Sequence, residues 1–74
     1  MKIDDFIATL KDCFTDKGIV LEPTTRYKEI PEWGSMMALV VIAAIDQEYG
    51  KIITADEIAR TNTVEELFHI VQQK

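Results

Sequence analysis

The first part of the chain alternates apolar and polar positions with the period of a helix. Apolar side chains recur every three or four residues, and charged side chains such as Asp4, Asp5 and Lys11 fall on the opposite side. This spacing predicts an amphipathic helix over about residues 3–16, with Gly18 as its stop. The two acids in the first turn suit the positive end of the helix dipole. The apolar stripe consists of Ile3, Phe6, Ile7, Leu10, Cys13 and Phe14.

Three further helices are predicted in the second half of the chain. An apolar segment over about residues 35–49 is followed by Gly50, a typical helix terminator. Thr54-Ala55-Asp56-Glu57 and Thr63-Val64-Glu65-Glu66 both have the Thr-x-x-Glu form of a capping box. They predict a short helix over about residues 55–60 and a last helix over about 64–73. The inward stripe of the last helix is expected to be Val64, Leu67, Phe68 and Val71.

Residues 18–34 show no helical period and predict a long loop. Two prolines, a pair of threonines and Gly34 interrupt this stretch. A loop of this length in a small domain is usually functional. We expect its apolar residues to fasten it across the bundle, with a short helical turn near residues 25–29 and Trp33 as a packing contact. Those apolar residues are Ile19, Val20, Leu21, Tyr27, Ile30 and Trp33.

The predicted fold class is all-α, because no segment indicates a strand. The expected architecture is a four-helix bundle with three longer helices, one short helix and a long loop between the first two. A chain of 74 residues forms one domain, over residues 1–74, and its 47% of hydrophobic residues is too high for disorder to be the default. One cysteine excludes an internal disulfide, and one cysteine with one histidine cannot complete a four-ligand zinc site.

The formal net charge of −5 narrows the range of partners. A nucleic-acid partner would require a basic face, so we expect none. The charge favours partner proteins with basic docking patches. The apolar run over residues 36–45 is too short to span a bilayer, and no signal-peptide pattern is visible. We therefore expect a cytoplasmic protein without membrane insertion, most simply a monomer.

The order of elements, with a serine that opens the second helix, resembles the acyl carrier protein family over essentially the whole chain. The family has Asp-Ser-Leu at this helix start, matched here by Gly34-Ser35-Met36. In the family, helix two ends in an acidic stretch followed by an aromatic residue and a glycine, and residues 46–50 match this ending. The family's acidic short third helix is matched by residues 55–58, and the Thr-Val-acid opening of its last helix by residues 63–65. Two departures stand out. Gly34 stands where the family's aspartate helps the modifying enzyme to recognise its target, and helix two, whose exposed face is normally acidic, has Met37 and Val40 at two of the acidic positions.

The resemblance implies a carrier and not an enzyme. Ser35 would bear 4′-phosphopantetheine, donated by coenzyme A through a phosphopantetheinyl transferase. The arm would hold acyl groups as thioesters for acyl-loading, synthase or acyltransferase enzymes of fatty-acid, polyketide or related biosynthesis, hence of lipid metabolism. A peptidyl or aminoacyl carrier is the near alternative, although the double glycine usual before its serine is absent.

Ser35 also has a simpler interpretation, because serine is a favoured helix N-cap. As an arm-bearing residue, it would need only to present a hydroxyl at a helix start, where unpaired N–H groups and the dipole favour an attached phosphodiester. A stand-alone hydrolase finds no support, because no motif places a base beside Ser35. We expect Cys13 to be a buried structural thiol and His69 to be a partly exposed helix residue.

The predicted second helix is apolar nearly all round, so it is either buried or an interface. We expect Ala38, Leu39, Ile42, Ile45 and Tyr49 to face the core. The resemblance implies that partners dock on the opposite arc, with added charge from Glu32 and Asp46. The expected docking residues are Gly34, Met36, Met37, Val40, Ala43, Glu48, Asp56 and Glu57. Two alternatives remain open: the long loop covers this arc, or the protein is a small helical adaptor that carries no cofactor.

Overall fold

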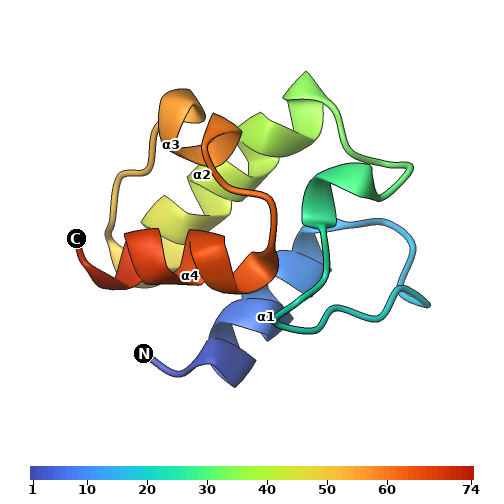
Figure 1. Ribbon diagram of the computed structural model, residues 1–74, viewed down its shortest axis with the longest axis horizontal. Coiled ribbons are helices and arrows are strands. Elements are labelled where there is room, and N and C mark those ends of the chain that lie inside the picture. Colours follow the sequence, from blue (N-terminus) through green and yellow to red (C-terminus); the bar gives the residue numbers. More distant parts are fainter.

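The computed structural model describes all residues 1–74 and contains four α-helices and no strand (Figure 1). Helix α1 spans Ile3–Cys13, α2 Ser35–Tyr49, α3 Ala55–Ala59 and α4 Val64–Gln72. A single 3-10 turn, η1, spans Tyr27–Glu29 within the long connection between α1 and α2. The all-α class, the four helices and the short turn in the loop are therefore confirmed. None of the helices combines the length and apolarity needed to cross a bilayer.

Helix α1 ends earlier than its apolar stripe predicts, at Cys13 instead of about residue 16. Phe14 is already extended, with φ −91° and ψ 146°, although its side chain remains buried. The Glu32 carboxylate accepts hydrogen bonds from the main-chain N–H groups of Thr15 and Asp16, both at 2.9 Å. A longer helix would direct those N–H groups to its own carbonyls, so this tertiary contact competes with the last turn. Gly18 lies beyond the helix and does not end it.

The core lies where α1, α2 and α4 meet, and it also contains residues of the long loop. On α1, Phe6 and Leu10 are buried, and the whole predicted stripe of α4 is buried. The rings of Phe6 and Phe68 pack with centroids 5.5 Å apart. Leu21 and Tyr27 are buried residues of the long loop, and the Tyr27 hydroxyl is hydrogen-bonded to the Thr61 hydroxyl. The complete core comprises Phe6, Leu10, Phe14, Leu21, Tyr27, Val41, Ile45, Ile53, Ile58, Val64, Leu67, Phe68 and Val71.

The long loop is fastened across the bundle, as the sequence predicts. The carbonyls of Pro23 and Thr25 accept hydrogen bonds from the N–H groups of Glu65 and Val64, at 2.9 and 3.0 Å. These donors belong to the first turn of α4, where helix N–H groups lack partners within the helix. Lys28 donates to the carbonyls of Ile58 and Ala59 at the end of α3. The loop is therefore part of the packed structure, although Val20 points outward.

Both predicted capping boxes are present. Thr54 and Glu57 cap the start of α3, and Thr63 and Glu66 cap the start of α4. In each box the threonine hydroxyl accepts a hydrogen bond from the main-chain N–H of the glutamate, and the glutamate carboxylate accepts one from the main-chain N–H of the threonine. The end of α2 follows the expectation as well. Gly50 is left-handed at φ 65°, which favours glycine, and its N–H bonds the Asp46 carbonyl at 2.8 Å.

Candidate functional site

Ser35 is the first residue of α2, and its side chain is exposed. Gly34 occupies the N-cap position in an extended conformation, and no side chain caps the helix. The interpretation of Ser35 as the N-cap is therefore wrong. The Ser35 hydroxyl makes no hydrogen bond within the protein, unlike the capping hydroxyls of Thr54 and Thr63. It is also the sole serine in the chain.

The N-terminus of α2 is open. Its first intrahelical bond runs from the Ala38 N–H to the Gly34 carbonyl, at 3.0 Å. The N–H groups of Ser35, Met36 and Met37 have no partner in the protein. Helix α2 also carries no acidic residue in its first turn, whereas α1, α3 and α4 all do. The positive end of its dipole is therefore uncompensated, which favours an anion attached at the Ser35 oxygen.

The segment that leads to Ser35 is anchored on both sides of Trp33. Glu32 accepts three hydrogen bonds of 2.9 Å from the main chain of Thr15 and Asp16 and from the Thr15 hydroxyl. Those bonds lower the pKa of the Glu32 carboxyl, the main-chain donors first. The Trp33 ring packs edge-on against the Tyr27 ring, with their centroids 5.1 Å apart, which confirms Trp33 as a packing contact. Glu32 was expected to offer docking charge, but the fold itself uses this carboxylate.

The core-facing side of α2 differs from the prediction. Val41 and Ile45 are fully buried, whereas Leu39 is 64% exposed. At about 100° per residue, Leu39 and Val41 point to nearly opposite sides of a helix. The prediction for Leu39 is therefore wrong, and Val41 is the core residue that it missed. Ala38, Ile42 and Tyr49 are half-buried against the core, in agreement with the prediction.

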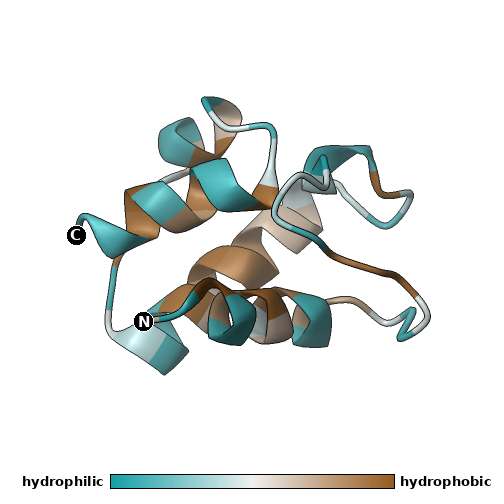
Figure 2. Ribbon diagram, turned by 60° about the horizontal axis from the view of Figure 1, so that its bottom comes forward, coloured by the Kyte–Doolittle hydropathy of each residue, from teal (hydrophilic) through white to brown (hydrophobic).

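The outward face of α2 carries an exposed apolar surface, which we call the α2 stripe: Met36, Leu39, Val40 and Ala43. Met36 is 75% exposed and Val40 is 40% exposed. The long loop does not cover these residues, so the alternative that this arc is core is wrong for the α2 stripe. Met37 is half-buried and packs against the core. Figure 2 shows apolar colour along most of α2, whereas α1 and α4 alternate apolar and polar positions.

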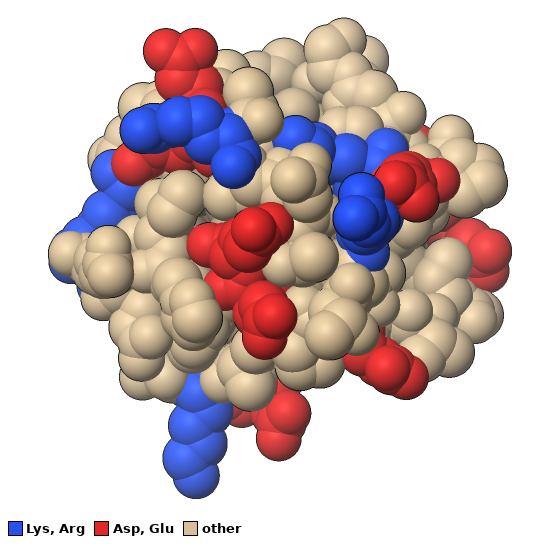
Figure 3. Space-filling view, viewed as in Figure 1, with Lys and Arg blue, Asp and Glu red and all other residues tan.

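The acidic residues that were expected to dock partners differ in whether their carboxylates are free. Glu48 and Asp56 are exposed. Glu57 is not free, because its carboxylate accepts from the Thr54 N–H and contacts the Lys74 ammonium, both at 2.9 Å. Lys74 and the Thr54 main chain lower the pKa of Glu57. On the face of the molecule that Figure 3 shows, acidic and basic side chains are interspersed with uncharged surface. The net acidity therefore does not form one continuous patch there.

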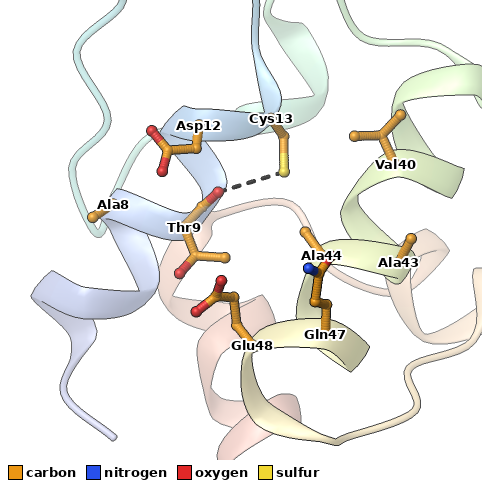
Figure 4. Close-up of a pocket in the computed structure, with 9 residues that line it drawn as sticks. All are labelled: Ala8, Thr9, Asp12, Cys13, Val40, Ala43, Ala44, Gln47 and Glu48. Carbon is orange, nitrogen blue, oxygen red and sulfur yellow. Dashed lines mark hydrogen bonds between the residues drawn. The ribbon is translucent and has the colours of Figure 1, made fainter.

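A cleft of about 460 Å³ lies between α1 and α2 (Figure 4). Cys13 lines it and is half-buried, so the expected buried thiol is only partly enclosed. The thiol donates a hydrogen bond to the Thr9 carbonyl at 3.4 Å, and burial followed by the charge of Asp12 raises its pKa. A raised pKa disfavours the reactive thiolate. His69 is exposed on α4, as expected. The sequence did not predict this cleft.

The structure brings together no group of three or more His, Cys, Asp or Glu side chains that could hold a metal ion. Comparisons of the chain with models of protein families, with curated proteins and with solved structures find no match. Ser35 at an open helix start, the α2 stripe beside it and the cleft are thus the features on which a function can be based.

Proposed function

We propose that this protein is an acyl carrier protein that bears 4′-phosphopantetheine on Ser35. The observation that carries the proposal is the exposed Ser35 hydroxyl, unbonded within the protein, at a helix start that lacks both a side-chain cap and a first-turn acid. The order of a long loop, a short third helix and a capped last helix, which resembles that of the family, also supports the proposal. When bound, the arm supplies a thiol that holds an acyl group as a thioester.

Attachment of the phosphopantetheine arm requires no catalytic group from the carrier itself. A transferase would supply the base and the metal. The Ser35 oxygen would bond to the β-phosphorus of coenzyme A, adenosine 3′,5′-bisphosphate would leave, and the base would take the hydroxyl proton. The carrier must present that hydroxyl on a defined backbone. The approach to Ser35 is open, because no atom outside the two neighbouring residues lies within 4 Å of where a Cβ on Gly34 would be. Main-chain N–H groups of the first turn then face the new phosphodiester, an interaction of about 0.3–1 kcal/mol.

The test is the intact mass of the protein after incubation with coenzyme A, magnesium and a broad-specificity phosphopantetheinyl transferase. We expect a gain of one phosphopantetheine in the wild type and no gain in Ser35→Ala. Cys13→Ala, measured under reducing conditions, is the matched control, because Cys13 is the sole thiol that could form a mixed disulfide with coenzyme A. It should gain the same mass as the wild type. Absence of any gain, also with the transferase of the source organism, would overturn the proposal.

A second candidate function is that of a small adaptor that binds a partner through α2 and carries no cofactor. The exposed α2 stripe favours it, because contiguous apolar surface on a small protein commonly marks an interaction site. The mass measurement separates the two functions. Loading at Ser35 supports the carrier, whereas an unmodified protein that still binds partners through the α2 stripe would be an adaptor.

A further inference from the structure

The cleft between α1 and α2 is lined by apolar residues and has two exposed acidic residues at its rim. Ala8, Cys13, Val40, Ala43 and Ala44 provide the apolar part of its lining. Thr9, Asp12, Gln47 and Glu48 provide the polar part, and no lysine or arginine lines the cleft. In Figure 4 the Asp12 carboxylate belongs to α1 and the Glu48 carboxylate to α2, on the two walls of the cleft. Its electrostatic preference is therefore for a cation.

The two rim carboxylates have no partners within the protein. Glu32, Glu57 and Glu66 all accept main-chain hydrogen bonds that hold loops or helix starts. Asp12 and Glu48 accept no hydrogen bond through their carboxylates and take part in neither of the two ion pairs in the chain. The nearby Lys17 ammonium donates to the Asp12 main-chain carbonyl, at 3.2 Å, and not to its carboxylate. Both rim charges are thus available to an external cation.

The cleft opens onto the α2 stripe, because Val40 and Ala43 belong to both. A protein seated on the exposed Met36 and Leu39 would therefore have side chains within reach of the cleft. An arginine side chain matches its chemistry, because an apolar stem bears a planar guanidinium whose several N–H groups can serve two carboxylates. A lysine has the same stem, with a single point charge at its end.

We propose that the cleft receives an arginine side chain of a partner protein that is docked on the α2 stripe. Its stem lies on Ala44 and Val40, and its guanidinium lies between Asp12 and Glu48. The partner surface is therefore apolar with one protruding arginine, and its footprint extends from α2 onto α1. The biological setting, an enzyme that acts on the cargo of Ser35, rests on the proposed function, whereas the binding chemistry of the cleft does not.

Butylguanidinium, which reproduces the end of an arginine side chain, is the probe. It would be titrated into the unmodified ¹⁵N-labelled protein, and the amide resonances followed by NMR. We expect saturable shifts at cleft residues such as Thr9 and Ala44. Pentanoate, a chain of similar length with the opposite charge, should produce none. Because no arm is attached, failure here leaves the mass test of Ser35 unaffected, and failure of that test leaves this result unaffected.

Three isosteric variants locate the interaction. Asp12→Asn and Glu48→Gln should each weaken butylguanidinium binding by up to about fivefold, the range expected for one solvent-accessible ion pair. Asp4→Asn removes the same charge from α1 outside the cleft and should leave the affinity unchanged. The proposal would be overturned by an absence of saturable shifts in the cleft, by equal binding of pentanoate, or by an equal effect of Asp4→Asn.

Discussion

Helices α4 and α2 are both rich in apolar residues, but they bury them differently. Helix α4 has nine residues and buries four of them: Val64, Leu67, Phe68 and Val71. Helix α2 has fifteen residues, is the more apolar helix, and fully buries only Val41 and Ile45. Apolar composition therefore does not measure burial in this protein. Helix α2 leaves several apolar side chains exposed to solvent, and this exposed surface is the basis of the docking that we propose.

The starts of the two helices differ in the same sense. The first turn of α4 is closed by the Thr63–Glu66 capping box and by the loop carbonyls of Pro23 and Thr25. The first turn of α2 has neither cap nor acid, and it begins at an exposed serine. The apolar face and the first turn of α4 are thus both packed within the fold. The α2 stripe and the first turn of α2 both remain exposed to solvent.

The largest expected effect comes from the same substitution made in both helices. Leu67→Ala in α4 removes a fully buried side chain and should lower the free energy of unfolding by about 2–5 kcal/mol. Leu39→Ala in α2 trims an exposed side chain and should change it by about 0.5 kcal/mol or less. Urea unfolding followed by circular dichroism measures both. Equal destabilisation by the two variants would contradict the contrast between the helices.

A smaller loss of stability is expected at acidic pH, because the ionised carboxylate of Glu66 accepts the hydrogen bonds of the α4 cap. The N–H groups of Thr63 and Asn62 lower its pKa below the ordinary 4.5. A lowered pKa in the folded state means that this contribution is complete above about pH 4.5 and is lost as the pH falls through the folded-state value. Thermal unfolding between pH 7 and pH 3 should therefore show a shallower acid decline for Glu66→Gln, which can still cap the helix.

The neighbouring Glu65→Gln is the control for that measurement, since no hydrogen bond engages its carboxylate in the cap. It should retain the acid decline of the wild type. If Glu65→Gln flattens the decline as much as Glu66→Gln does, general charge and not the cap is responsible.

The smallest effect is expected from closing the start of α2. Gly34→Asp introduces a cap at an extended position where an added Cβ would have no atom within 4 Å outside the two neighbouring residues. Aspartate is preferred over glycine at an N-cap by a few tenths of a kcal/mol, so a slight rise in melting temperature is expected. The same variant supplies the aspartate of the carrier pattern, and we expect faster loading of Ser35. A fall in melting temperature would show that the open start of α2 is not simply an unfilled cap.

Much of the fold could be predicted, because several local patterns were strong. The two Thr-x-x-Glu sequences predicted the starts of α3 and α4, and the periodic spacing of α4 predicted its buried stripe. The site was predicted less completely. Ser35 was placed correctly at the start of α2, but the cleft between α1 and α2 could not be foreseen, because it depends on how closely the two helices approach.

The sequence by itself determined the order of the helices, their caps and the alternation of the faces of α1 and α4, because these depend on residues within one or two turns of one another. Only the tertiary structure decided the rest. Glu32 ends α1 early from across the loop, and α2, apolar on nearly every side, turns Val41 inward and Leu39 outward. A helix without a polar side has no orientation of its own, so its neighbours determine which residues it buries and which it exposes.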